Sequence, residues 1–249
     1  MEALPEKKKK VAIVGFAGTR DEAPFNDPDY EIWTVNNLHN FVPRQDRIFQ
    51  IHQRWEWNPA PGEPKHHGVT TEEHVKYLKT CGLPIYTVEH YPDIPTSVRY
   101  PLELMVEEFG IPRTGHDQTK DAYFTNTISF MIALAIYEKF ETIEIYGVDM
   151  AVGTEYNEQR PSCEYYLGIA KGRGIEVKLP ASADLLKSRF VYGFESEKIA
   201  AWKKKVQKTI GEMTKRKQEA DHAVRLQQSV SDKYEGAIAA VREMDSRWS

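Results

Sequence analysis

Short apolar runs alternate with amphipathic stretches along roughly the first 180 residues of the chain. Each apolar run is bounded by polar or turn-forming residues, which predicts β-strands at 11–16, 32–35, 47–51, 85–88, 143–146 and 176–179. Apolar positions at three- and four-residue steps predict helices at 72–79, 101–109, 128–139 and 163–172. Because strands and helices alternate, we expect a doubly wound, Rossmann-like α/β fold with a mainly parallel sheet and helices on both faces.

The pattern changes abruptly near residue 195. All 14 prolines precede residue 181, and beyond residue 195 only Gly211 and Gly236 interrupt a run of helix-forming residues. Apolar residues recur there at mostly three- and four-residue steps, which predicts one long amphipathic helix; a break at 227–231 leaves a helical hairpin as the alternative. We therefore expect a flexible basic N-terminus at 1–10, a Rossmann-like nucleotide-binding domain at 11–194 and a helical or coiled-coil appendage at 195–249, which either packs on the body or forms a homo-oligomer.

Composition indicates a globular protein, with 41% hydrophobic and 28% charged residues. The net charge is −4, yet residues 195–249 hold 12 Lys and Arg against 9 Asp and Glu, so the body is acidic. An acidic body argues against duplex DNA spread over its surface but leaves a local nucleic-acid contact open. With no apolar run of about 18 residues, we expect no membrane association and a cytoplasmic location. Two cysteines, Cys81 and Cys163, are expected to be buried or incidental thiols.

A carboxylate follows the predicted strand at 143–146, in the sequence Gly147-Val-Asp149. Open α/β sheets bind ligands at the carboxyl ends of their strands, so we expect a site there. Asp149 can bind a divalent ion, bond a ribose hydroxyl or cap its own loop. The residues that follow include four further polar or aromatic candidates, Glu155, Tyr156, Arg160 and Glu164. These acids allow a carboxylate cluster, and the sequence leaves the metal requirement unknown.

The turn after the first predicted strand contains Gly15, Gly18, Thr19 and Arg20. Glycines there let backbone N–H groups approach a phosphate, and the threonine and arginine add donors. The spacing is not the Gly-x-Gly-x-x-Gly dinucleotide pattern, so a merely tight turn is the alternative.

Three further groups of candidates lie beside predicted strand ends and a helix start. Asn36 and Asn37 follow the second strand, where a base or ribose lies in this fold, although Asn is also a common turn residue. His52 follows the third strand and is either a general base or a structural histidine. Thr125, Asn126 and Thr127 lie at the start of the helix at 128–139. They either bind a phosphate at the helix N-terminus or simply cap the helix.

Several of these segments together carry a resemblance. The glycine turn at 15–19, the segments 27–33 and 97–101, the helix at 125–135, the Gly-Val-Asp strand end and the segment 155–165 resemble a family of largely uncharacterised tailed-bacteriophage proteins, over nearly all of residues 10–193. More distantly, the small-residue helix that leads to the Gly-x-Asp strand end is similar to the bacterial sialyltransferase-like and hydroxymethylpterin-pyrophosphokinase-like Rossmannoid groups. That second resemblance implies a nucleotide-activated donor.

The leading hypothesis is a nucleotide-binding transferase, and specifically a glycosyltransferase with a nucleotide or nucleotide sugar as its bound small molecule. The base and ribose would meet the two asparagines, the phosphates the glycine turn and the helix start, and His52 or Asp149 would be the base, with Arg160 on the leaving phosphate. If the protein belongs to a phage, we expect it in the host cytoplasm, with DNA or a surface glycan as acceptor. A non-catalytic nucleotide-binding module and a virion or assembly protein with a Rossmannoid scaffold are the alternatives.

Overall fold

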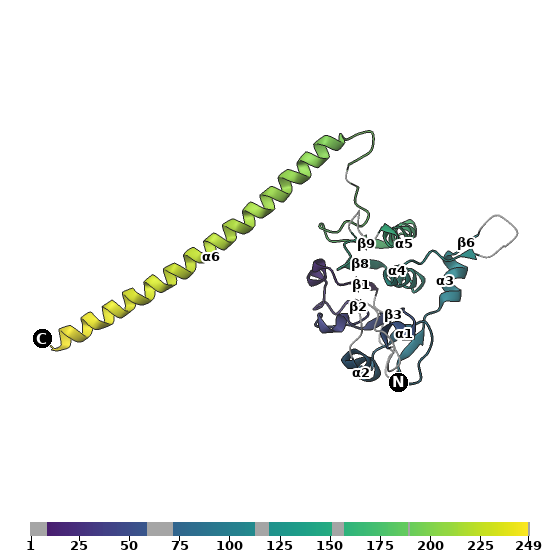
Figure 1. Cartoon of the computed structure of the whole chain (residues 1–249), viewed down its shortest axis with the longest axis horizontal. Helices are drawn as coiled ribbons and strands as arrows, with labels where there is room; N and C mark the ends of the chain where they lie inside the picture. Colours follow the sequence, from purple (N-terminus) through teal and green to yellow (C-terminus); the bar gives the residue numbers. More distant parts are fainter. Residues whose placement is uncertain (1–8, 59–71, 113–119, 151–156, 189, 249) are drawn as a thin grey trace. The chain divides into compact units, whose positions relative to one another are not determined.

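A seven-stranded parallel sheet forms the centre of the fold (Figure 1). The computed structural model describes residues 9–58, 72–112, 120–150, 157–188 and 190–248. The strands of the sheet are β1 (Lys10–Val14), β2 (Tyr30–Val35), β3 (Arg47–Gln50), β4 (Ile85–Thr87), β5 (Ser97–Arg99), β8 (Thr142–Tyr146) and β9 (Glu176–Lys178). Their order is β5-β4-β3-β2-β1-β8-β9, and all neighbours run parallel. The predicted doubly wound α/β class is therefore confirmed.

The six predicted strands are all present, each within two residues at either end. The sequence analysis missed β5, a three-residue edge strand in which only Ser97 is buried. Such a strand has no apolar run to reveal it. A second, two-stranded antiparallel sheet pairs β6 (Ile111–Pro112) with β7 (Lys120–Asp121).

Four predicted helices are confirmed as α2 (Glu72–Thr80), α3 (Leu102–Phe109), α4 (Thr127–Tyr137) and α5 (Arg160–Gly172). α5 begins three residues before the predicted start, so Arg160 lies in its first turn and not ahead of the helix. Pro161 in its first turn is typical of a helix N-terminus. Three short elements were not predicted: α1 (Arg54–Trp57) and the 3₁₀ helices η1 (Gly18–Glu22) and η2 (Leu38–Asn40).

The core has a layer on each face of the sheet. On one face, Val11, Ile13 and Trp33 pack with α3, α4 and α5, which Figure 1 shows gathered on one side of the strands. α4 is buried along most of its length, which explains why it is apolar all round. The other face has two smaller clusters, one with Leu38 of η2 and one with Leu78 of α2.

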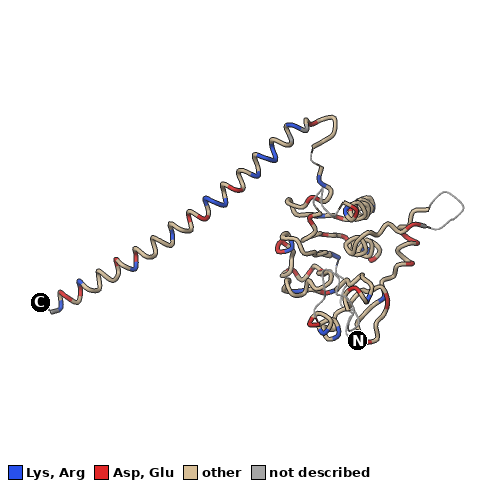
Figure 2. Tube along the Cα trace, viewed as in Figure 1, with Lys and Arg blue, Asp and Glu red and all other residues tan. Residues whose placement is uncertain are grey.

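The chain divides into two compact units, residues 1–187 and 188–249. The second contains α6 (Glu197–Trp248), a single helix of 52 residues that continues through 227–231 without a turn. The hairpin alternative is therefore wrong: with no proline and only two glycines, nothing in the chain forces a break there. Figure 2 shows the basic residues of α6 concentrated in its first half. None of the helices among the described residues is long and apolar enough to span a membrane.

Candidate functional site

The strand order reverses between β1 and β8, so their carboxyl ends form the topological switch point of the sheet. Val14 pairs with Tyr146, and the glycines that follow them, Gly15 and Gly147, face each other. A Cβ atom on Gly15 would lie 2.5 Å from the Gly147 carbonyl oxygen, and one on Gly147 would clash with the Gly15 carbonyl. Gly147 also has a φ of +64°, which favours glycine. The close contact of the two strand ends thus explains Gly15 without a phosphate.

A hydrogen bond joins the two sides of the switch point. The Thr19 hydroxyl in η1 donates to Asp149 Oδ1 over 2.9 Å and accepts from the Gly147 N–H over 2.8 Å. Thr19 is buried, whereas Asp149 is half-buried. The threonine therefore orients a carboxylate that lies at the end of β8, with Asp149 Oδ2 unbonded among the described groups.

Arg20 is held mainly by its own turn. Its Nη1 donates to the Phe16 carbonyl over 3.1 Å, its Nε to Asp21 over 3.3 Å, and the guanidinium lies 5.3 Å from the centre of the Phe41 ring. Gly18 is uncrowded, because an added Cβ would have no atom within 4 Å. Both residues border the switch point.

Asn36 directly follows β2 and lies in the left-handed region, with a φ of 50°. Its side-chain Oδ1 is buried and has no hydrogen-bond partner in the described structure. Leaving a buried polar atom unpaired costs about 1–3 kcal/mol, and Trp33 Nε1 and the Tyr91 hydroxyl in the core are unpaired in the same way among the described residues. Asn37 follows as the N-cap of η2, without a side-chain capping bond.

The N-termini of α4 and α5 are tied together at the same edge of the sheet. Asn126 caps α4 by accepting from the Ser129 N–H over 3.0 Å, and its amide nitrogen donates to the Gln159 carbonyl over 2.8 Å. The Thr125 hydroxyl lies 2.6 Å from the Ser162 hydroxyl. These bonds give Thr125 and Asn126 a structural role that needs no ligand. Thr127 follows as the first residue of α4.

Arg160 lies at the start of α5 with a side chain only 13% exposed. Its Nε donates to Glu164 Oε1 over 2.7 Å, and its Nη2 donates to the Lys187 carbonyl over 3.4 Å. Glu164 Oε1 also accepts from the Leu186 N–H over 2.8 Å, so the ion pair fastens residues 186–187 to α5. Arg160 Nη1 is buried and unpartnered among the described residues. A buried guanidinium with a free N–H is a natural partner for an anionic oxygen.

His52 is exposed beyond the end of β3, with Nδ1 4.0 Å from Glu56 Oε2. Three strand spacings of about 4.8 Å separate β3 from β8, so His52 lies roughly 14 Å along the edge from Asp149. The two side chains are therefore not brought together. Glu155 and Tyr156 lie outside the described residues. Within the described ranges, no three His, Cys, Asp or Glu residues gather in a way that would hold a metal ion.

A histidine pair that the sequence analysis missed lies between η2 and α2, with His74 buried and His39 half-buried. His39 Nε2 is 2.9 Å from His74 Nδ1, and His74 Nε2 is 3.2 Å from Gln50 Oε1 at the end of β3. The His39 ring also stacks on Tyr77, with centroids 3.8 Å apart. Burial lowers the pKa of His39, and burial together with the charge of His39 lowers the pKa of His74 to about 4. No spacing in the sequence links these residues, because the pair is made by tertiary contact.

Cys163 is confirmed as a buried thiol. It lies in α5, and its Sγ donates to Asn126 Oδ1 over 3.3 Å. Burial raises the pKa of the thiol to about 12, so it is protonated and unreactive at neutral pH.

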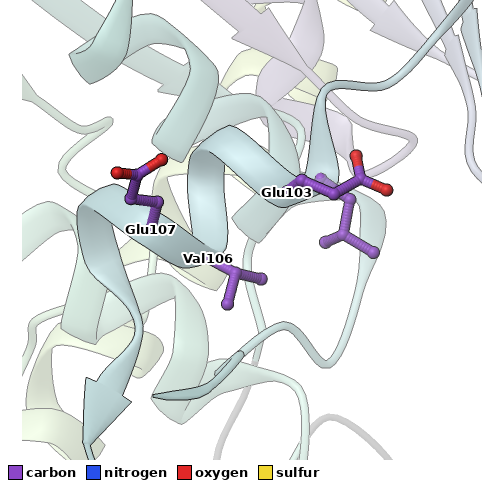
Figure 3. A pocket seen from close by; sticks show the side chains of 4 residues that line it. Glu103, Val106 and Glu107 are labelled. Atoms are coloured by element: carbon purple, nitrogen blue, oxygen red, sulfur yellow. The ribbon is translucent and has the colours of Figure 1, made fainter. Parts of the chain in front are cut away.

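An open depression of about 440 Å³ lies on the outer surface of α3, lined by Leu102, Glu103, Val106 and Glu107 (Figure 3). α3 follows the edge strand β5, and β4, β3 and β2 separate β5 from the switch point. The lining residues in the described part of the chain all come from one helix and do not converge on a ligand. The depression is therefore not the candidate site.

The fold and the switch-point residues define a Rossmann-like α/β protein with a polar site between β1 and β8. No protein-family model and no curated protein matches the chain. Among solved structures, it is similar to the Campylobacter jejuni sialyltransferase CstII in complex with the substrate analogue CMP-3FNeuAc, with 13% identity, a TM-score of 0.43 and coverage of 76% of this chain and 92% of that chain. It is also similar to the apo form of an α-2,3-sialyltransferase from Campylobacter jejuni, with 12% identity, a TM-score of 0.42 and coverage of 73% and 77%. Likeness at this level says nothing of what this chain binds or catalyses.

Proposed function

We propose that the protein is a nucleotide-binding transferase that uses a nucleotide sugar as donor and transfers the sugar to a hydroxyl group. The observation that carries this proposal is the pair of buried, unpartnered polar atoms near the switch point, Asn36 Oδ1 and Arg160 Nη1. They belong to elements on either side of the Thr19–Asp149 hydrogen bond. A nucleotide has both complements, since its base and ribose donate hydrogen bonds and its phosphates accept them.

The assigned roles follow the order of the strands. The base and ribose meet Asn36 and Asn37 beyond β2, while the phosphates meet the 15–20 turn, the start of α4 at Thr127 and the Arg160 guanidinium. Helix N-termini favour anions, and a fixed guanidinium stabilises the phosphate charge that grows as the sugar leaves.

The bond between the sugar and the donor phosphate breaks as the acceptor oxygen bonds to the sugar, and a base takes the acceptor proton. Asp149 is the better supported base, because Thr19 orients its carboxylate at the switch point, whereas His52 is exposed about three strands away. His52 remains the second candidate. The transfer assay is run with and without magnesium, which tests for a divalent-metal requirement.

The first experiment is a thermal-shift screen of the full chain against nucleotides and nucleotide sugars. A ligand at about 100 times its Kd stabilises the native state by about 2.7 kcal/mol, which raises the Tm by roughly 5–10 °C for a domain of this size. We expect Asn36→Gly to reduce the shift; glycine keeps the left-handed backbone and removes only the amide. Asn40→Gly, an exposed change in η2, is the matched control. No shift with any member of the panel at millimolar concentration refutes the site.

Turnover separates the transferase from its alternatives. In a transferase, Asp149→Asn lowers sugar transfer at least about 100-fold while nucleotide affinity changes little. Binding without donor consumption would indicate a non-catalytic nucleotide-binding module. Neither binding nor turnover would indicate a virion or assembly protein with a Rossmannoid scaffold.

The finer parts of the proposal rest on the resemblance to phage proteins. We place the reaction in the cytoplasm, that of the host if the protein belongs to a phage, with a modified base in phage DNA that carries a hydroxyl group, or a surface glycan, as acceptor. The basic first half of α6 favours the nucleic acid. Competing acceptor DNA and oligosaccharide in the transfer assay decides between them.

A further inference from the structure

The helix α6 exposes apolar side chains along its whole length. Its 52 residues span about 78 Å at about 1.5 Å per residue. Trp202 is 64% exposed, Tyr234 68% and Val241 66%, and Ile199, Met213, Val230 and Met244 are also exposed. A helix with so much exposed apolar surface is marginally stable alone and is stabilised when a partner covers that surface.

Seven of the exposed apolar residues fall on the two core positions, a and d, of a seven-residue repeat, whereas Ile210, Val224 and Ile238 fall on the flanking e position and Leu226 on g. The first core positions, a, are Ile199, Val206, Met213, Ala220, Gln227, Tyr234, Val241 and Trp248. The second core positions, d, are Trp202, Thr209, Arg216, Ala223, Val230, Ala237 and Met244. The repeat passes through 227–231 unchanged, so the polar residues there do not interrupt the register. A repeat of 3.5 residues per turn indicates a left-handed coiled coil with a partner that has the same period.

We infer that α6 pairs with α6 of a second copy as an antiparallel two-stranded coiled coil, centred between Asp221 and His222. A second copy fits because its helix has the same length and the same core positions, so a and d residues of the two helices can meet along their whole length. The a, d, e and g positions amount to roughly 30 residues per copy, the number found on each side of stable protein interfaces.

The antiparallel direction follows from the one charged core residue. In a parallel pair, Arg216 faces its own copy at a d position, which brings two like charges together. In the antiparallel pair, each a residue meets a d residue of the partner helix. Arg216 then meets Gln227, whose amide oxygen can accept its hydrogen bond, and Ala220 meets Ala223 at the centre.

The charges of the rest of the helix favour the same direction. Residues 197–221 contain eight Lys and Arg against four Asp and Glu, whereas residues 222–248 contain four of each. A parallel pair places the two basic halves together, while an antiparallel pair places each basic half beside a neutral one. The antiparallel register brings the g positions Glu212 and Lys233 together but also places Lys198 beside Arg247, so the direction rests on the two halves of the helix and not on the g pairs.

Association is tested on the full chain by light scattering across a range of concentrations. We expect a dimer, and we expect Val230→Asp at a d position to weaken it at least about tenfold. Ser229→Asp, which puts the same charge one residue away on the outer surface, should leave the dimer unchanged. A monomer at all concentrations, or equal effects of the two variants, overturns the inference.

Direction is tested by a spin label at Lys204, on the outer surface, introduced as Lys204→Cys together with Cys81→Ser, while the buried Cys163 stays unlabelled. The antiparallel pair separates the two labels by about 50 Å along the helix axis, whereas a parallel pair holds them roughly 20–30 Å apart. Electron-electron distance measurement distinguishes the two, and the short distance overturns the inference.

Coupling between core positions gives a second test of direction. Arg216→Leu and Gln227→Leu, alone and together, form a mutant cycle on the dimer dissociation constant. The effects are non-additive if these residues share a layer. Additive effects, expected if the residues are about 16 Å apart on parallel helices, overturn the antiparallel register.

Discussion

Acid should destabilise the body of this protein through His74. The side chain is 1% exposed, and its Nδ1 lies 2.9 Å from His39 Nε2. Burial, with the charge of His39 as a second cause, lowers the pKa of His74 from about 6.5 to about 4 in the folded state. The histidine therefore folds as a neutral ring that accepts a proton less readily than it does in the unfolded chain.

The sign and size of the effect follow from that difference. Between pH 6.5 and 4 the unfolded chain binds a proton at His74 that the folded protein does not, so the free energy of unfolding falls as the pH falls. A difference of about 2.5 pKa units corresponds to about 3 kcal/mol of unfolding free energy. This stability is fully present above pH 6.5 and is lost as the pH falls toward 4. The pKa of His39 is also lowered by burial, which adds to the loss in the same direction.

Urea unfolding followed by circular dichroism, at intervals from pH 7.5 to 4.5, measures this loss. Two side chains face the pair, Gln50 and Tyr77, and neither titrates in this range. The Gln50 amide has no titratable group, and burial raises the pKa of Tyr77 above its ordinary value of about 10. His74→Gln removes the titrating ring, so its stability should fall less steeply with acid than that of the natural protein. The exposed His52→Gln serves as the control and should keep the natural slope. Equal slopes for His74→Gln and the natural protein, or titration of the His74 ring near pH 6.5 by NMR, would refute the reasoning.

Three further predictions concern the sheet and the thiols. Gly15→Val should lower the free energy of unfolding by about 3 kcal/mol or more, because its side chain would meet the Gly147 carbonyl, while Gly18→Ala should change it by less than about 1 kcal/mol in the same urea titration; equal effects would contradict the strand-end contact. Arg47→Met should cost about 3–5 kcal/mol, because it leaves Glu31 and Glu138 without their shared buried partner, and adding Glu138→Gln should recover part of that loss; an unchanged urea midpoint would disprove a role for this cluster. A thiol reagent should modify Cys81 in the native protein and Cys163 only after unfolding, as counted by mass spectrometry; rapid double modification would show that α5 is not packed as described.

Local pattern was sufficient to predict most of the scaffold. The buried strands of a parallel sheet are short apolar runs, and α4 is apolar all round because it is buried, so both can be identified from sequence alone. The 52-residue helix α6 follows from the absence of proline, since helix continuity depends on local propensity. The edge strand β5 was missed because two of its three residues are exposed. The start of α5 was placed too late, although Pro161 gave the local signal for it.

The sequence also predicted a site at the strand ends, because strand ends can be predicted wherever strands can. It placed Asp149 after one strand and Thr19 in the turn after another but contained nothing that joins them, since they are 130 residues apart and meet only when β8 inserts beside β1. The facing contact of Gly15 with Gly147 and the pairing of His39 with His74 are of the same kind. Propensity and periodicity act over a few residues and therefore determined the elements of this protein. Contacts between distant segments depend on which strands lie side by side in the sheet, and only the tertiary structure decided that.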